Sequence, residues 1–292
     1  MTKIYCLSWP GHRLELGRRT AVMGIVNVTP DSFSDGGRFY ATEDAIQQAR
    51  RLVAAGADII DIGGESTRPY AEDVPAETEM ARVLPVIEGL ARKIDVPISI
   101  DTTKAVVAEA AVAAGASMIN DIGALRLDPR MADVAVRYDL PVILMHMQGL
   151  PRTMQIDPTY ADVVADVKQF LRDALQRAES AGIDRGKIII DPGIGFGKTI
   201  AHNLMLIRNL EALAELDVPV LVGPSRKAFI RKLLADRSGE ALDAGRPEVI
   251  TGTQAAVSAA VLNGAHIVRV HDVAATRTTV KIVDAVRNAG GL

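Results

Sequence analysis

Residues 97–121 read PISIDTTKAVVAEAAVAAGASMIND, and this stretch decides the fold. It contains two short β-rich apolar runs, at 97–100 and 117–120, with a segment of helical period at 104–115 between them. That segment ends on Gly115, and glycine commonly follows the last turn of a helix. Two strands joined by a helix are typical of a parallel β–α–β unit, because parallel strands need a long crossover connection.

The same alternation runs along the chain. The apolar runs are continuous rather than alternating, as expected when both faces of a sheet are covered. They lie at 21–26, 58–62, 97–100, 117–120, 141–145, 187–191, 219–223 and 266–270. The expected helices lie at 42–56, 76–93, 104–115, 129–138, 160–182, 201–216, 249–264 and 273–290. Eight strand–helix units predict an α/β fold, a (β/α)8 TIM barrel. An open doubly wound sheet is the alternative, but it gives no reason for the count to stop at eight.

Two shorter segments precede the first of these runs. They are IYC at 4–6 and RLEL at 13–16, and we expect them to form an N-terminal β-hairpin that caps the bottom of the barrel. No linker or low-complexity tract interrupts the chain. We therefore expect residues 1–292 to form a single domain.

Composition narrows the functional class. The chain has 292 residues, of which 48% are hydrophobic, as in ordinary globular proteins. A net charge of -3 gives no general attraction to nucleic acid or to an anionic membrane. A single cysteine, Cys6, allows no intrachain disulfide and fits a reducing compartment. With no apolar signal core at the N-terminus and no run long enough to span a membrane, we expect a cytoplasmic protein.

A polar residue closes each of the eight runs. Since the active site of a (β/α)8 barrel lies at the carboxyl ends of its strands, these residues are expected to meet at one rim. A single Asp after a strand often only starts a turn, and for Asp61 and Asp121 that interpretation is as good as a functional one. It does not account for eight strands at once. The closing residues are Asn27, Asp61, Asp101, Asn120 with Asp121, His146, Asp191, Lys227, and Arg269 with His271.

These residues suit two parts of a ligand. Asp101, Asn120 and Asp191 suit a flat heterocycle with an edge of N–H groups, because buried carboxylates need donors. Cationic residues suit an anion such as a phosphate ester, and they are Arg68, Lys227, Arg269 and His271. Asn27 suits a metal that the phosphate carries, since Mg²⁺ takes oxygen ligands. A salt bridge to a barrel carboxylate is the alternative for Arg269 and Lys227, and we favour anion binding.

Other motifs are weaker. The GIGFG segment at 193–197 is equally consistent with a phosphate-binding loop and with a tight turn. His146 has no second His or Cys at ligand spacing, which favours a hydrogen-bonded core histidine over a metal ligand. We expect Met145 and Met147 to pack in the core, and His202 to lie near a helix cap or on the surface.

Two loops are long for a barrel of this kind, at 27–41 and 63–75. Long loops without secondary structure are commonly functional. Gly36-Gly37 gives hinge freedom, while Phe33 and Pro69 offer apolar contact surface. We interpret the first loop as a lid that orders over bound substrate.

Eight motifs together resemble the dihydropteroate synthases of folate synthesis. They cover the chain in order from about Arg13 to its end, and the first and the last two are specific to this family. DPG and ND alone also occur in pterin-binding methyltransferase barrels, a rival that should lack the TPDSFSDGG and SRK loops; a non-catalytic paralogue is a second rival. The motifs are MGIVNVTPDSFSDGG, DIGGESTRP, DTTK, NDI, LMHMQGLPRTMQ, DPGIGFGKT, GPSRKAFI and RVHDV.

The resemblance implies a reaction and partners. A dihydropteroate synthase condenses 6-hydroxymethyl-7,8-dihydropterin pyrophosphate with p-aminobenzoate, gives 7,8-dihydropteroate and pyrophosphate, uses Mg²⁺ and is a target of sulfonamides. The family reaction is dissociative, so the pyrophosphate leaves before the aniline nitrogen attacks the pterin methylene cation. Family members are homodimers formed through helices of the later half of the chain.

The resemblance also assigns residues. It implies that the pterin edge is held by Asp101, Asn120 and Asp191, that Lys227 reaches the pterin carbonyl, and that Arg269 flanks the ring. Asp101 and Lys227 are the implied catalytic residues. The implied pyrophosphate pocket is Asn27, Arg68, Arg269 and His271, with Asn27 near the metal. The implied p-aminobenzoate site is Phe33, Thr67, Pro69 and Ser225.

Overall fold

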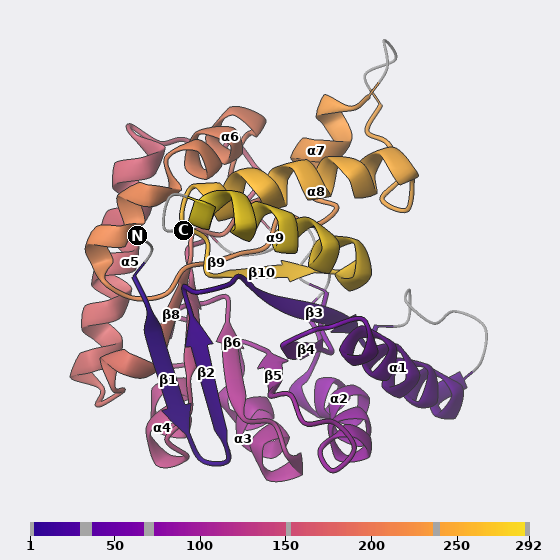
Figure 1. Cartoon of the computed structure of the whole chain (residues 1–292). Coiled ribbons are helices and arrows are strands. Elements are labelled where there is room, and N and C mark those ends of the chain that lie inside the picture. The colour runs from indigo at the N-terminus through magenta and orange to yellow at the C-terminus, as the bar shows by residue number, and fades with distance from the viewer. Residues whose placement is uncertain (1–2, 30–36, 67–72, 150–152, 236–239, 290–292) are drawn as a thin grey trace.

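Eight parallel strands form a nearly closed barrel with helices around it (Figure 1), as the sequence predicts. The structure is a computed structural model that describes residues 3–29, 37–66, 73–149, 153–235 and 240–289. The strand order is β8-β7-β6-β5-β4-β3-β10-β9. An isolated parallel bridge between Ile190 and Val220 joins the two edges of this sheet.

Each predicted run supplies one strand, with ends that differ by one or two residues. The largest difference is at 219–223, where only two residues are in strand conformation. The strands are β3 (Ala21–Asn27), β4 (Ile59–Gly63), β5 (Ile98–Asp101), β6 (Met118–Asp121), β7 (Val142–Met145), β8 (Ile188–Asp191), β9 (Leu221–Val222) and β10 (Ile267–Val270). Their side chains are almost all buried, which explains why the runs do not alternate in polarity.

The helices correct the sequence prediction in three places. The first helix begins at Gly37, five residues before the predicted start, so the first long loop is shorter than 27–41. The segment 201–216 divides at Asn209, whose side-chain amide donates to the Met205 carbonyl and competes with the helical pattern. A short helix after β9 was not predicted. The α-helices are α1 (Gly37–Ala54), α2 (Ala76–Leu90), α3 (Ala105–Ala114), α4 (Met131–Arg137), α5 (Val163–Ser180), α6 (Ile200–Arg208), α7 (Ala228–Leu233), α8 (Pro247–Leu262) and α9 (Val273–Asn288), and the 3-10 helices are η2 (Arg185–Lys187) and η3 (Leu210–Leu216).

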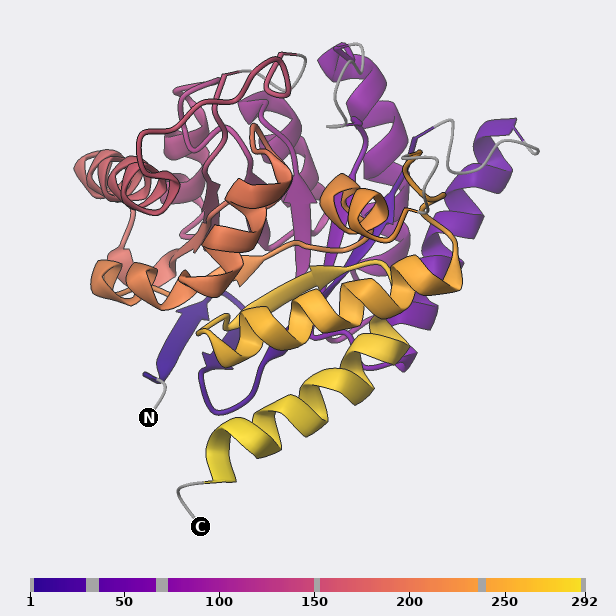
Figure 2. The ribbon, with the colours of Figure 1, turned by 90° about the horizontal axis from the view of Figure 1, so that it is seen from above.

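The predicted hairpin is present as β1 (Tyr5–Trp9) and β2 (His12–Leu16), two antiparallel strands. Tyr5 packs edge-on against His266, which precedes β10, so the hairpin lies at the amino ends of the barrel strands. Figure 2 shows the same ribbon from above, with the helices around the barrel. Within the described part of the chain, no helix combines the length and the apolar character needed to cross a membrane.

Candidate active site

A buried carboxylate, Asp61 of β4, connects three strands just below the rim. Its Oδ2 accepts a hydrogen bond from Asn120 Nδ2 at 3.0 Å and another from Arg269 Nε at 2.6 Å. The Asp61 side chain is 0% exposed, and its Oδ1 has no partner among the described residues. Because one N–H of Nδ2 is used here, the carbonyl oxygen and the second N–H of that amide are the groups left for a ligand.

Asp61 and Asp121, for which the sequence allowed either a turn or a functional role, differ in their hydrogen-bond partners. Asp121 accepts hydrogen bonds from the amides of Gly123 and Leu125, both at 2.7 Å, so it shapes the β6–α4 loop. Asp61 instead contacts two predicted site residues. Its position inside an apolar strand was the available signal, since a carboxylate there requires polar partners.

Arg269 lies between two carboxylates. Its Nη2 donates to Asp101 Oδ2 at 2.7 Å, while Nε donates to Asp61. The salt-bridge alternative is therefore realised for Arg269 in the ligand-free protein, while the expected anion binding by this residue stays a prediction. Burial raises the pKa of Asp101 to about 7; Arg269 lowers that pKa, and the negative charge of Asp61 raises it further. A carboxyl group in this state readily accepts a positively polarised partner, because such a partner removes the cost of burying its charge.

Asp191, the last residue of β8, is a second carboxyl group whose ionised form is destabilised by burial. It is 6% exposed, its Oδ1 accepts the Gly193 amide at 2.7 Å, and burial raises its pKa to about 6. The glycine-rich segment after it is a tight turn, not a phosphate cradle. A Cβ on Gly193 would lie 1.9 Å from the His146 carbonyl oxygen, and the Gly195 amide is already bonded to Asn203 Oδ1.

Lys227 stands at the start of α7 without a carboxylate partner. Among the described residues it makes no salt bridge, and its Nζ lies 3.8 Å from the centre of the Phe196 ring. Burial, together with the charge of Arg269, lowers the pKa of Lys227 to about 8. The salt-bridge alternative is thus not realised for Lys227, and its ammonium is available to a ligand acceptor.

Ser225 and His271 contact each other across the turns that follow β9 and β10. Ser225 Oγ accepts the His271 amide at 3.2 Å and lies 3.0 Å from its Nδ1. Burial, with the charges of Arg226 and Arg269, lowers the pKa of His271 to about 3. His271 is therefore neutral near pH 7, which corrects its description as a cation. In the tautomer in which the Ser225 hydroxyl donates to Nδ1, the ring proton is on Nε2, where it can donate to an anion.

Asn27 ends β3, opposite Gly63 in the register. Its side chain makes no hydrogen bond to any other described residue. No cluster of three or more His, Cys, Asp or Glu within the described ranges could hold a metal ion. The side chain of Asn27 fits the role of a single oxygen ligand to a magnesium ion whose other ligands are waters and phosphate oxygens.

Four predicted site residues lie outside the described residues: Phe33, Thr67, Arg68 and Pro69. Both described ends of the second long loop are fixed by a network that the sequence did not reveal. Lys104 Nζ lies 2.7 Å from Glu65 Oε2 and 2.7 Å from Glu79 Oε2, while Glu65 Oε1 accepts the Val74 amide at 2.8 Å. This network ties the beginning of the loop to its end.

His146 is a core histidine, as expected. Its Nδ1 lies 2.8 Å from Lys198 Nζ, its ring packs edge-on against Phe170, and burial lowers its pKa to about 2. Lys198, which sequence reasoning missed, is 3% exposed, and burial lowers its pKa to about 7. Met145 and Met147 are buried in one apolar cluster, and His202 forms a capping box at the start of α6.

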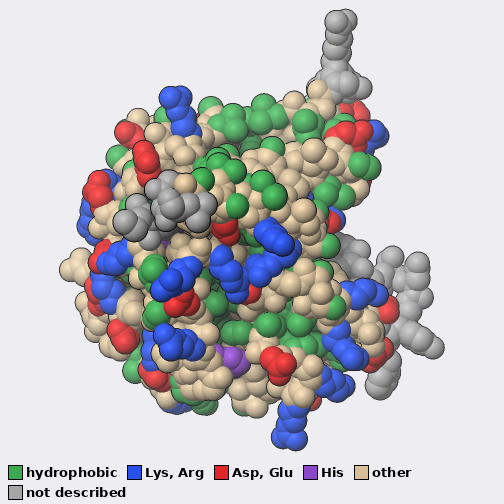
Figure 3. All heavy atoms as spheres, in the orientation of Figure 1, with side chains coloured by type: hydrophobic (Ala, Val, Ile, Leu, Met, Phe, Trp, Pro, Cys, Tyr) green, Lys and Arg blue, Asp and Glu red, His purple; other side chains and the backbone are tan. Residues whose placement is uncertain are grey.

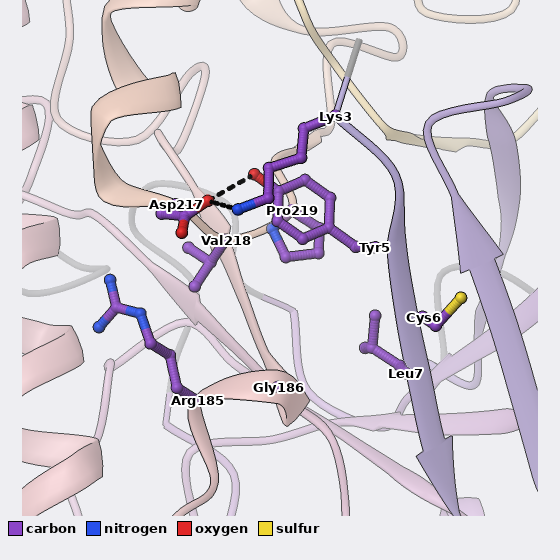
Figure 4. A pocket seen from close by; sticks show the side chains of 9 residues that line it. All are labelled: Lys3, Tyr5, Cys6, Leu7, Arg185, Gly186, Asp217, Val218 and Pro219. Carbon is purple, nitrogen blue, oxygen red and sulfur yellow. Dashed lines mark hydrogen bonds and ion pairs between the residues drawn. The ribbon is translucent and has the colours of Figure 1, made fainter.

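A separate pocket lies at the opposite end of the barrel, between the hairpin and the segments that precede β8 and β9 (Figure 4). Lys3 and Tyr5 both bond to Asp217 there, and Arg185 donates to the Leu216 carbonyl at 2.5 Å. Lys3 and Asp217 pair with each other, and Arg185 pairs with Glu179 outside the lining, so each charged group of this pocket already has a partner. Cys6, which lines it, is far from the rim, as the sequence suggested.

Comparisons with known proteins agree with this geometry. The sequence profile described as "Pterin binding enzyme" matches residues 23–271. The dihydropteroate synthase of Synechocystis sp. is 48% identical over 92% of this chain and 91% of its own length. The Xanthomonas albilineans dihydropteroate synthase with 4-aminobenzoic acid has a TM-score of 0.88 and 47% identity, covering 98% of this chain and 99% of that one. The Yersinia pestis enzyme in a sulfonamide drug complex has a TM-score of 0.87 and 44% identity, covering 97% and 99%.

Proposed function

This chain belongs to the dihydropteroate synthase family of pterin-binding enzymes, and we propose that the polar groups at its barrel mouth divide the work of that reaction as follows. The enzyme condenses 6-hydroxymethyl-7,8-dihydropterin pyrophosphate with p-aminobenzoate to 7,8-dihydropteroate in folate synthesis, and it is a target of sulfonamides. The observation that supports the residue roles is the network from Asp61 to Asn120, Arg269 and Asp101.

The pterin binds to Asp101 and Asp191, two carboxyl groups whose ionised forms are destabilised by burial. Asp101 and Asp191 have raised pKa values because they are desolvated, so N–H donors of the ring stabilise their ionised forms. The free carbonyl oxygen of Asn120 accepts a further N–H, and Lys227 donates to an acceptor on the opposite edge. Orientation of the ring by these fixed groups places its methylene carbon near the anion pocket.

Bond cleavage places charge on both fragments. When the bond from the methylene carbon to the pyrophosphate oxygen breaks, its electron pair leaves with the pyrophosphate. The ionised Asp101 stabilises the pterin methylene cation, while the guanidinium of Arg269 and the Nε2–H of His271 stabilise the leaving anion. The lone pair of the aniline nitrogen then forms the new C–N bond, and that nitrogen loses its proton to solvent or to the released pyrophosphate.

We also propose that Asn27 would supply one oxygen ligand to a Mg²⁺ ion bound with the pyrophosphate, and that this ion would neutralise part of the charge on the leaving group. Arg68 adds a second cation to the anion pocket. Phe33, Thr67, Pro69 and Ser225 line the p-aminobenzoate site. These assignments rest on the family resemblance, and the position of Asn27 at the end of β3 supports the first of them.

Turnover is the direct test. The purified chain is given both substrates and Mg²⁺, and pyrophosphate release is measured together with 7,8-dihydropteroate formation. We expect equimolar products that require both substrates. Pterin binding without turnover would instead indicate a non-catalytic paralogue, and methyl transfer from a folate would indicate the rival barrel family.

We further propose a cytoplasmic homodimer. The supporting feature is apolar surface on α6, α7 and α8, where Met205 is 46% exposed, Leu233 53% and Leu262 52%. Figure 3 shows hydrophobic side chains gathered over the helices at the top of the view. We expect the double variant Met205→Asp, Leu262→Asp to sediment as a monomer while the unchanged chain sediments as a dimer. Equal sedimentation would refute this interface.

A further inference from the structure

The β9–α7 turn carries two site residues but has almost no strand to hold it. β9 is only Leu221–Val222, which pair with Ile267 and Val268 of β10. Ser225 and Lys227 therefore lie beyond the last rung of this ladder. A turn that must place functional groups needs another source of rigidity there, because catalytic groups have to be held to fractions of an ångström.

Side-chain hydrogen bonds connect the β9–α7 and β10–α9 turns where backbone hydrogen bonds of the sheet have ended. Ser225 bonds to His271, and the next residue of each turn makes a second, stronger connection. The Arg226 guanidinium donates from Nε to Asp272 Oδ2 at 3.1 Å and from Nη2 to Asp272 Oδ1 at 2.6 Å. Parallel two-point bonds of this kind fix orientation as well as distance.

The backbone at Arg226 supports a functional role for this pair. Its φ is 57°, in the left-handed region that favours glycine and costs a residue such as arginine free energy. The Arg226 amide is held by Thr253 Oγ1 at 3.1 Å, and Thr253 is fully buried in α8. The strained conformation is thus anchored, and it directs the arginine toward Asp272.

We propose that Arg226 and Asp272 are positioning residues, which clamp the β9–α7 turn to the β10–α9 turn and thereby fix the site residues beside them. Lys227 follows one member of the clamp and His271 precedes the other. The substrate acts on both turns, since its pterin meets the lysine and its pyrophosphate meets the histidine. The inference rests on the proposed function, because it deepens the account of that same site.

Two variants separate positioning from plain electrostatics. Asp272→Asn removes a negative charge near the anion pocket, so electrostatics alone predicts tighter pyrophosphate binding, whereas loss of the clamp predicts weaker binding. Arg226→Lys keeps the charge but loses the two-point geometry, and the clamp again predicts weaker binding. A merely structural ion pair would change the melting temperature and leave the pyrophosphate affinity of the folded protein unchanged.

The measurement is titration of the full chain with inorganic pyrophosphate in the presence of Mg²⁺, by calorimetry, with circular dichroism to confirm folding. We expect both variants to bind about tenfold more weakly, a loss of about 1.4 kcal/mol. The matched control is Arg246→Lys, which alters the exposed pair of Arg246 with Glu248 and should bind as the unchanged chain does.

Unchanged or tighter binding in folded Asp272→Asn would overturn the clamp, while the proposed function would stand. If Asp272→Asn does not fold, Arg226→Lys decides by the same titration, and unaltered affinity in it overturns the clamp. Failure of the unchanged chain to bind pyrophosphate would instead overturn the proposed function, and the clamp with it.

Discussion

The ammonium nitrogen of Lys227 lies 3.8 Å from the centre of the Phe196 ring. An aromatic face attracts a cation but does not neutralise it, and this attraction is worth about 0.5–2 kcal/mol. The unliganded protein therefore keeps a half-buried, charged lysine whose pKa has fallen to about 8. Such a group costs folding free energy until a substrate supplies an acceptor.

Lys227→Met should separate activity from stability. Loss of a hydrogen bond from a charged group costs about 1.5–3 kcal/mol, so kcat/KM should fall about tenfold or more. Because the folded pKa is below the unfolded value, the charged lysine destabilises the fold at every pH below about 8. The melting temperature at pH 7 should therefore hold or rise. A clear drop in melting temperature with normal activity per folded molecule would contradict this role.

Asp191→Asn should weaken pterin binding by about tenfold or more and leave the fold intact. The raised pKa of Asp191, about 6, means that its ionised form destabilises the unliganded fold above that pH, so the amide should not lower stability at pH 7. Calorimetric titration with a pterin measures the first effect and thermal melting the second. Asp173→Asn, on the exposed side of α5, is the control; equal pterin affinity in both variants would remove Asp191 from the site.

Asp61→Asn should move a pH profile. The pKa of Asp101, about 7, reflects burial, the attraction of Arg269 and Lys227, and repulsion from Asp61 and Glu79. Removal of the Asp61 charge lowers the pKa of Asp101, so the acidic limb of kcat/KM should shift to lower pH. A purely structural Asp61 would reduce activity at every pH and leave the limb in place. Glu109→Gln, which alters the exposed pair with Arg137, is the control.

Sulfonamide binding should depend on the anion. Asn27 begins the loop that contains Phe33, and Arg68 belongs to the same loop as Pro69. Pyrophosphate and Mg²⁺ should therefore order both loops before the aromatic ring binds. Ordering a few residues costs about 1–2 kcal/mol each, a cost that the first ligand bears. Calorimetry should show tighter sulfonamide binding with pyrophosphate present, and the reverse coupling of equal size. Equal affinities would leave the lid interpretation without support.

Most of the barrel could be read from the sequence because its strands are continuous apolar runs, which periodicity detects well. The ends of elements were less accessible. The division at Asn209 accompanies a local side-chain hydrogen bond, which the order of residues alone does not show, and the helix start at Gly37 lies five residues before the predicted one.

Site residues at strand ends were predictable because one rim collects them. Their partnerships were not. Asp61 lies inside its apolar run and Asp121 at the end of its run, but only the packing of β4, β6 and β10 shows which side chains Asp61 connects. The neutral state of His271 was hidden for the same reason, since it follows from burial and two neighbouring arginines.

The barrel has a seam. The edge strands β8 and β9 meet through the isolated bridge of Ile190 and Val220, where the Ile190 amide donates to the Pro219 carbonyl at 3.0 Å. Because fewer backbone hydrogen bonds join these two strands, we expect the barrel to open locally most readily here. Asp191 ends β8 on one side of the seam, and Lys227 follows β9 on the other. A pterin that binds both residues would therefore connect the two edge strands. We expect amide hydrogen exchange at Ile190 and its neighbours to slow when pterin binds, so that the substrate itself completes the wall around it.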